Sequence, residues 1–283
     1  MKTIAIGLLL LCGMGAVAQT TESQPHQHRP TPPWYVDRFR ISAGFFIPIS
    51  HTDISVGNTS GTRGTNISFE NTLGYNHTNF TFLSDLQWRA GRRSRFDLGY
   101  YRIARSSSHV LDRDITFGDH TYPINAATSS FFNTDIFRFS YGYALLCKPR
   151  AEAGIMIGAH IVKAGVGIAG STSIGSFAAS DDYGFTAPLP DIGIWGGYTF
   201  AKRWAVTGEI SYLSLTVDNI KGKIIAANLL VMYRVIQRLS VTAGYTGFNF
   251  DVEATRKNLV GNLVWGYNGP AVSASWSFGH KSW

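Results

Sequence analysis

Residues 130–147, SFFNTDIFRFSYGYALLC, alternate with a period of two. From Phe137 onward every second residue is large and apolar, and the positions between them hold small or polar residues such as Arg138 and Gly142. This is the spacing of side chains on the two faces of a β-strand. Aromatic residues gather toward one end of the apolar face. That arrangement is more typical of a strand with one face in lipid and the other in a filled lumen than of a soluble sheet.

The same alternation recurs about ten times along the chain. We predict strands at 39–56, 80–89, 95–105, 130–147, 152–165, 187–200, 204–217, 223–234 and 239–252, followed by an apolar stretch from Leu259 to Phe278. That last stretch is ambiguous, because Leu263 and Trp265 share one parity and Trp276 and Phe278 share the other. Asn268-Gly269-Pro270 lies between them.

The Asn-Gly-Pro sequence is either a turn between two strands or a bulge in one strand that also exchanges its two faces. Bacterial single-chain barrels have even strand counts. We therefore predict a bulge and ten strands, with twelve strands as the alternative.

Composition separates this chain from a helical membrane protein. Hydrophobic residues make up 45% of it and charged residues only 15%, which suits a protein that exposes part of its exterior to hydrocarbon. No internal run of 18 apolar residues is present, so transmembrane helices are not expected. The remaining spanning structure is a closed barrel. The predicted fold class is all-β, a single closed antiparallel transmembrane β-barrel.

The N-terminus has the pattern of a secretory signal, with Lys2, an apolar core and the small residues Ala16-Val17-Ala18. We expect residues 1–18 to be a signal peptide, 19–38 a flexible periplasmic lead-in rich in proline, and 39–283 the barrel. Removing the signal leaves Cys147 as the single cysteine, so no intrachain disulfide is expected. His26 and His28 in the lead-in are not expected to bind a metal.

Long and short connections alternate along the predicted strands. The long ones follow the first, third and fifth strands, and the short ones are AGRRS, KPR, AKR and IQR. Outer-membrane barrels have long loops outside the cell and tight turns in the periplasm. Aromatic residues near the turns fit an interfacial girdle, and its predicted members are Trp88, Tyr143, Tyr198, Trp204, Tyr233 and Phe278.

These features together resemble the bacterial outer-membrane β-barrel proteins. The resemblance rests on the signal, the lead-in, the alternating strands and the terminal SWSF, and it covers most of the mature chain. The segments LDRDITFGDHTYPI, FRFSYGYALL and APLPDIGI are similar to a group of barrel proteins without an assigned activity. The resemblance implies an outer-membrane location in a Gram-negative cell and folding by the barrel assembly machinery, which reads a terminal aromatic such as Phe278 or Trp283. It implies no catalytic residue.

The charges fall into two predicted sets. One set occupies the short turns and forms a basic ring that would face anionic lipid head groups: Arg92, Arg93, Lys148, Arg150, Lys202, Arg203 and Arg238. The other set lies in the lumen by parity and should pair internally, since unpaired buried charges are costly: Arg40, Asp85, Asp97, Arg138, Glu152, Asp191 and Glu209. The formal net charge of +7 does not indicate nucleic-acid binding, because the cations form no cluster on a binding motif.

The sequence leaves three functional hypotheses open. We expect a monomeric barrel with a largely closed, charge-lined lumen, no enzyme activity, no cofactor and no metal, with a structural or surface-interaction role for three long loops. The alternative is a narrow, porin-like pore for small solutes. The third hypothesis is an outer-membrane hydrolase, for which Asp112, Asp114, Asp119 and His120 share one loop and Asp181-Asp182 lie in another.

Overall fold

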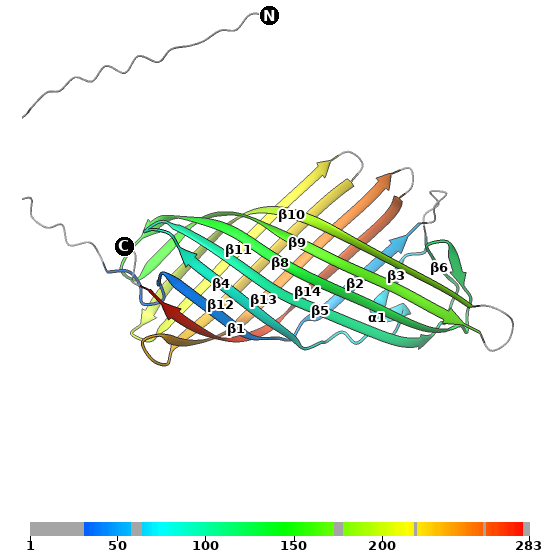
Figure 1. Ribbon diagram of the computed structural model, residues 1–283, viewed down its shortest axis with the longest axis horizontal. Helices are drawn as coiled ribbons and strands as arrows, with labels where there is room; N and C mark the ends of the chain where they lie inside the picture. The colour runs from blue at the N-terminus through cyan, green and yellow to red at the C-terminus, as the bar shows by residue number, and fades with distance from the viewer. Residues whose placement is uncertain (1–30, 58–63, 173–177, 218–219, 257–258, 280–283) are drawn as a thin grey trace, which may run out of the picture.

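Ten strands form a closed antiparallel ring in the computed structural model, which describes residues 31–57, 64–172, 178–217, 220–256 and 259–279 (Figure 1). Around the ring the order is β1, β4, β5, β8, β9, β10, β11, β12, β13 and β14, and β14 pairs with β1 to close it. The predicted fold class and the count of ten strands are confirmed. The expected signal peptide and most of the expected lead-in lie outside the described residues.

The strands are longer than predicted at the end opposite the chain termini. Their bounds are β1 Phe39–Phe46, β2 Ile49–Val56, β4 Thr81–Arg89, β5 Ser94–Val110, β8 Ala127–Cys147, β9 Ala151–Ser171, β10 Ala178–Ala201, β11 Trp204–Val217, β12 Ile220–Arg234, β13 Leu239–Arg256 and β14 Leu259–Phe278. A membrane-spanning strand needs only about 9–11 residues, whereas β10 has 24. Much of the stretch predicted as loops at 106–129 and 169–183 is therefore strand that continues beyond a bilayer's thickness.

Short turns join the strands at the end where both the described N-terminal residues and Phe278 lie, and we call this the turn end (Figure 1). The opposite, loop end carries short elements between the long strands. These are β3 (Ile67–Ser68) and α1 (Phe69–Thr72), which precede β4, and the hairpin of β6 (Ile115–Phe117) and β7 (His120–Tyr122) between β5 and β8.

The first predicted strand is interrupted in the middle. β1 and β2 both pair with β14 in one continuous register, and Ile47-Pro48 separates them. Opposite the interruption, the Ile47 amide donates to the carbonyl oxygen of Pro270 at 3.1 Å. A Cβ on Gly269 would lie 2.0 Å from the Ile47 carbonyl oxygen, so this close approach of two backbones requires glycine.

The predicted bulge at Asn268-Gly269-Pro270 is wrong, although the prediction of a single last strand is right. The pairing of β13 with β14 runs without a register shift, so the faces do not exchange. Trp265 is fully buried inside the barrel, whereas Trp276 is 47% exposed on the outside. At the loop end the large apolar residues of β14 face inward, because the lumen there is apolar. At the turn end they face outward, because the lumen there is polar and only the outer face is apolar.

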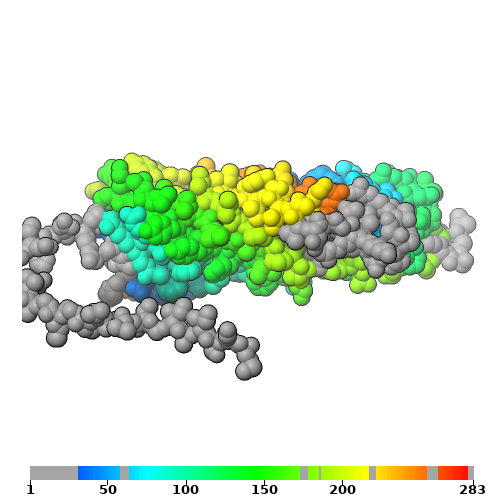
Figure 2. Space-filling view, turned by 90° about the horizontal axis from the view of Figure 1, so that it is seen from above, coloured from blue at the N-terminus to red at the C-terminus, as the bar shows by residue number. Residues whose placement is uncertain are grey.

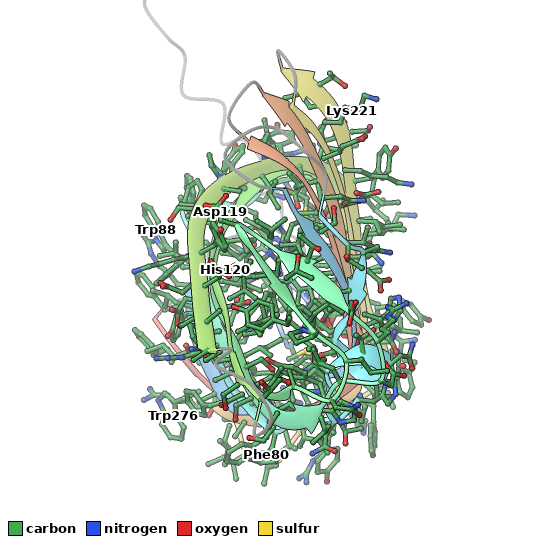
Figure 3. All side chains as sticks on the ribbon, turned by 90° about the vertical axis from the view of Figure 1, so that its right-hand side faces the viewer. Phe80, Trp88, Asp119, His120, Lys221 and Trp276 are labelled. Carbon is green, nitrogen blue, oxygen red and sulfur yellow. The ribbon has the colours of Figure 1, made fainter. Side chains whose placement is uncertain are left out.

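An apolar core fills the loop-end half of the lumen. Inward-facing residues of the wall, among them Phe132, Phe250 and Trp265, pack against side chains from the elements between the strands. Phe69 of α1 and Phe117 of β6 are both fully buried there. Phe248 and Phe250 of β13 also face inward, at 3% and 1% exposure. A row of outward apolar residues covers the exterior (Figure 3, where Phe80, Trp88 and Trp276 project from the wall).

The ladder between β10 and β11 stops halfway along β10. Its last pair toward the loop end is Ile192 with Tyr212, whereas β10 pairs with β9 as far as Ala178. The Thr199 amide donates a hydrogen bond of 2.7 Å to the carbonyl oxygen of Arg150, which directly precedes β9. The backbone groups of Thr199 therefore point toward β9. Backbone groups alternate in direction, so Pro188 and Pro190 face β11. Proline has no N–H to donate, and the two strands diverge beyond this point (Figure 1).

The end of the expected lead-in packs into the turn-end mouth of the barrel. Tyr35 and Val36 are 4% and 1% exposed and contact Ala205 and Met232 of the wall. The sequence analysis gave these residues no packed role, because Pro-rich flanks hide an apolar triplet, Trp34-Tyr35-Val36.

Candidate functional site

The turn-end half of the lumen holds a cavity of about 230 Å³ lined largely by charged and polar residues. Six of the seven predicted lumen charges line it: Arg40, Asp85, Asp97, Arg138, Glu152 and Glu209. The seventh, Asp191, is buried nearby at 2% exposure. Each of these residues lies on the inward face of its strand. The lumen therefore brings together one predicted charge from each of β1, β4, β5, β8, β9, β10 and β11.

Glu209 of β11 is the centre of the polar network. One of its carboxylate oxygens pairs with the Arg138 guanidinium and accepts a hydrogen bond from Asn228 Nδ2 at 2.8 Å. Its other oxygen lies 3.5 Å from Arg95 Nη2. Three strands besides β11 are therefore tied to one carboxylate that is itself only 14% exposed.

Arg95 extends this network to the opposite wall. Its Nε lies 3.1 Å from Asp97 Oδ2, and Gln87 Nε2 donates to Asp97 Oδ1 at 2.6 Å. The Arg95 guanidinium also lies over the Trp195 ring, 3.7 Å from the ring centroid. A cation stacked on an indole face in a site without bulk water is held more strongly than at the surface.

Arg89 and Glu152 form a separate buried ion pair near the turn end. Arg89 Nη2 lies 2.8 Å from both Glu152 oxygens, and the two side chains are 1% and 3% exposed. Arg89 and Arg95 are not among the predicted lumen charges. Both residues share the parity of predicted lumen residues in their strands, Asp85 and Asp97, and that signal was sufficient to place them inside.

The buried charges in and beside the cavity are balanced. Arg40, Arg95 and Arg138 line the cavity, and Arg89 beside it pairs with Glu152. The four carboxylates of the lining belong to Asp85, Asp97, Glu152 and Glu209. Asp191 has its own partners, with His160 Nδ1 at 3.2 Å and the Ser211 hydroxyl donating at 2.7 Å. Mutual pairing offsets much of the desolvation cost of these ions.

A second buried ion pair fixes the loop-end elements inside the barrel. Arg105 of β5 pairs with Glu70 of α1 at 2.6 Å, and the side chains are 3% and 0% exposed. The same guanidinium donates to the Thr52 hydroxyl and to the carbonyl oxygen of Asn76. It also lies 5.0 Å from the centroid of the Tyr75 ring, and burial raises the pKa of Tyr75 to about 12. The sequence analysis did not identify this pair, since Glu70 lies in a stretch predicted to be a polar loop.

The structure joins the two acidic loops of the hydrolase hypothesis at a single point. His120 Nδ1 lies 3.0 and 2.9 Å from the Asp181 carboxylate oxygens. The Tyr122 hydroxyl, a donor, lies 2.9 Å from Asp181 Oδ2 and 3.1 Å from the carbonyl oxygen of Ile168. Burial, and then the hydrogen bond to Asp181, raise the pKa of Tyr122. Figure 3 shows Asp119 and His120 at the loop-end mouth.

Asp114, another acidic residue of these loops, accepts a hydrogen bond from the Ile124 amide at 2.6 Å, which stabilises the loop between β7 and β8. Among the described residues, no group of three His, Cys, Asp or Glu side chains is arranged to hold a metal ion. No helix in the described part of the chain is long and apolar enough to cross a membrane.

The predicted surface sets lie at the turn end. The seven cations of the basic ring are exposed in the turns after β4, β8, β10 and β12: Arg92, Arg93, Lys148, Arg150, Lys202, Arg203 and Arg238. Five girdle residues are exposed on the outer wall, Trp88, Tyr143, Tyr198, Trp204 and Phe278. Tyr233 is half-buried and packs on Trp204 with ring centroids 4.7 Å apart.

Comparison with solved structures identifies the fold. The outer-membrane protease OmpT from Escherichia coli aligns over 84% of this chain and 97% of its own, with a TM-score of 0.54 and 12% identity. This protein is an outer-membrane β-barrel. The translocator domain of the autotransporter NalP from Neisseria meningitidis covers 89% of this chain and 90% of its own at 10% identity, with a TM-score of 0.40.

A third similar structure is Ail, the attachment invasion locus protein of Yersinia pestis. It covers 83% of this chain and 97% of its own at 9% identity, with a TM-score of 0.33. No family model matches the chain, and no curated protein matches it in sequence. Because the identities are so low, the comparison with OmpT establishes the barrel fold alone, and no activity comes with it.

Proposed function

We propose that this barrel is a sealed, non-enzymatic protein that acts through the surface at its loop end. One observation carries the proposal, namely that side chains obstruct both halves of the lumen and leave only a cavity of about 230 Å³ in the turn-end half. The apolar core around Trp265 occupies the loop-end half, and the paired charges around Glu209 occupy the other. A ten-stranded ring is only slightly wider than the eight-stranded barrels that side chains alone can fill.

The arrangement of the polar half also supports this proposal. A conducting path through charged residues needs groups that can exchange partners with a passing solute. Here the three arginines of the lining, together with Arg89 beside the cavity, match the four lining carboxylates in number, and Tyr35 caps the mouth. The cavity of about 230 Å³ has room for roughly seven waters at about 30 Å³ each, and the apolar core lies between this cavity and the loop end.

Single-channel recording in planar bilayers tests the sealed lumen directly. We expect no reproducible conductance steps from the purified protein. An Arg138→Ala variant should be less stable to heat, because Glu209 loses its partner, and should still not conduct. The matched control is Lys202→Ala at an exposed turn, which should change neither property. Steps whose size depends on Arg138 would instead establish the alternative of a narrow pore.

Three further parts of the proposal concern partners. We expect a monomer, contact of the basic ring with membrane lipids, and insertion by the barrel assembly machinery through the aromatic C-terminal strand. Arg92, Lys148 and Lys202 lie in three different turns at one end, which suits a lipid surface. Sedimentation in detergent tests the monomer, and a Phe278→Ala variant tests assembly in cells.

A hydrolytic role is the second candidate, and the His120–Asp181 pair is the observation that favours it. A carboxylate on Nδ1 orients an imidazole so that Nε2 can take a proton from water. OmpT, whose fold is similar, is a protease, although so low an identity shows the fold alone.

The same His120, Asp181 and Tyr122 contacts are equally those of an anchor between the β6–β7 hairpin and β10. Incubation of the barrel with peptide and phospholipid substrates distinguishes the two roles. We expect the unmodified protein to show no more hydrolysis of these substrates than the His120→Ala, Asp119→Asn and Asp181→Asn variants. Turnover that disappears in these variants, while the β6–β7 hairpin stays ordered, would contradict the non-enzymatic assignment.

A further inference from the structure

An open apolar groove of about 590 Å³ lies on the outer wall across β8, β9, β10 and β11. Its floor is formed by isoleucines of β9 and β10, where Ile157 pairs with Ile192 and Ile155 pairs with Ile194. Ile194 is 60% exposed, so the floor faces the hydrocarbon and not the lumen. The lining residues are all isoleucine, tyrosine, methionine or glycine.

Tyrosines form the two sides of this groove. Tyr141 and Tyr143 lie opposite the isoleucines on the β8 side, and Tyr212 lies opposite Ile192 on the β11 side. The Tyr141 hydroxyl shares a hydrogen bond of 3.0 Å with the Ser94 hydroxyl, which fixes its ring. Aromatic rings stand taller than isoleucine side chains, so the floor is recessed between two walls.

The groove lies at the depth of acyl chains and not of head groups. Ile155 is four residues beyond the start of β9 at Ala151. At about 3.3 Å per residue and a strand tilt of about 40°, it lies roughly 10 Å below the turns. Half of the apolar band of such a barrel is about 12 Å tall, so the groove reaches the middle of the leaflet next to the turns.

The two turns of these same four strands carry four exposed cations. Lys148 and Arg150 join β8 to β9, and Lys202 and Arg203 join β10 to β11. No ion pair of these four cations is found among the described residues, whereas Arg89, Arg95 and Arg138 of the lumen are each paired with a carboxylate. A fifth cation, Arg93, lies 5.9 Å from the centroid of the Tyr143 ring at the edge of the groove.

We propose that this groove and these turns form one binding site for an anionic phospholipid of the periplasmic leaflet. An acyl chain occupies the groove, and the head-group phosphate and its net negative charge are held by Lys148, Arg150, Lys202 and Arg203. Charge complementarity selects the occupant: four unpaired cations favour a lipid with a net negative charge over a zwitterionic one. The site is independent of the sealed lumen and of the loop-end surface.

Native mass spectrometry of the full mature barrel tests the proposal. The protein is released from micelles that contain equal amounts of phosphatidylglycerol and phosphatidylethanolamine. We expect one phosphatidylglycerol to be retained in clear excess over phosphatidylethanolamine. The double variant Lys202→Gln/Arg203→Gln should weaken that retention about thirtyfold, at about fivefold for each cation.

Matched controls separate the site from general effects of charge and fold. Lys221→Gln/Lys223→Gln removes the same charge from the loop end and should leave retention unchanged. Ile194→Trp fills the groove and should abolish retention, whereas Leu229→Trp adds the same side chain to an outward position on β12 that is 63% exposed and lies outside the groove. Heat-modifiable migration on gels verifies that each variant is folded.

Three results would overturn the proposal. The first is equal retention of the two phospholipids by the unmodified protein, and the second is no retention of either. The third is full retention by folded Ile194→Trp. Conductance does not enter any of these measurements, so a failure here leaves the sealed-lumen proposal intact, and a conducting barrel leaves this site intact.

Discussion

Arg89 shows how an ordinary turn-flanking residue becomes part of the barrel interior. Its guanidinium faces both oxygens of Glu152, and neither side chain is more than 3% exposed. One nitrogen, Nη2, makes both contacts, and such charge-assisted hydrogen bonds are stronger than neutral ones. The pair joins β4 to β9 across the lumen, whereas the neighbouring cations of the same turn, Arg92 and Arg93, are exposed.

We expect Arg89→Met to lower the free energy of unfolding by about 3–5 kcal/mol, because it leaves the Glu152 charge buried without its partner. The double variant Arg89→Met/Glu152→Leu should recover most of this loss, since no charge then remains unpaired. Urea unfolding in detergent micelles measures both effects. Arg238→Met at an exposed turn is the control. Equal losses in the single and double variants would show that packing, and not the charge pair, sets the stability.

At the level of single elements, the prolines of β10 determine where the wall divides. Both direct their backbone toward β11, where they cannot donate to Ser214 or Thr216. We expect Pro188→Thr/Pro190→Thr to extend the ladder by two hydrogen-bonded residue pairs, from Ile192 to position 188. Hydrogen exchange then detects protection of the new amides at positions 188 and 190. Rapid exchange at both would mean that strand tilt separates β10 from β11 without help from proline. Pro270→Thr in β14 is the control, because it lies away from this seam.

The β6–β7 hairpin closes the loop end through contacts with two side chains of β10. Asp181 binds both His120 and Tyr122, and the Phe117 ring packs on Tyr183 with centroids 5.4 Å apart. We expect Asp181→Ala to raise amide exchange in β6 and β7 by roughly tenfold, which corresponds to the loss of about one net hydrogen bond. Asp182→Ala next to it is exposed and should have no such effect. Unchanged exchange in Asp181→Ala would show that the buried ring of Phe117 holds the hairpin alone.

At the level of the whole molecule, the barrel is closed separately at its two ends. Tyr35 and Val36 close the turn-end mouth, and the core around Phe69 and Trp265 closes the other (Figure 2 shows the elongated outer wall from above). Opening one end alone should therefore admit reagents without creating a path through the barrel.

We expect Tyr35→Ala/Val36→Ala to make a cavity-lining Ser273→Cys reporter react faster with a small water-soluble thiol reagent. The reporter is placed in a Cys147→Ala background, since Cys147 is the chain's other mature thiol. The same variant should still show no conductance. A reporter that reacts equally fast with the plug intact would mean that water already reaches the cavity freely.

Sequence alone determined much of this molecule, and the particular residues show why. Alternation in stretches such as 204–217 predicts the bounds of β11, because a strand's two faces have different surroundings. The same rule placed Arg138 and Glu209 in the lumen. It did not predict their pairing, since partners on β8 and β11 are adjacent only after the ring has closed and its stagger is fixed.

Three features were decided only by the tertiary structure. The lumen changes from apolar to polar along β14, so the large hydrophobic residues move from its inner face to its outer face. In the sequence this pattern looks like a bulge. The inward packing of α1 and of the β6–β7 hairpin converted predicted surface loops into core. The apolar groove depends on which isoleucines and tyrosines come into register. The sequence specifies which side of its own strand each residue faces, whereas the neighbours it meets depend on ring closure, where distant strands are brought together.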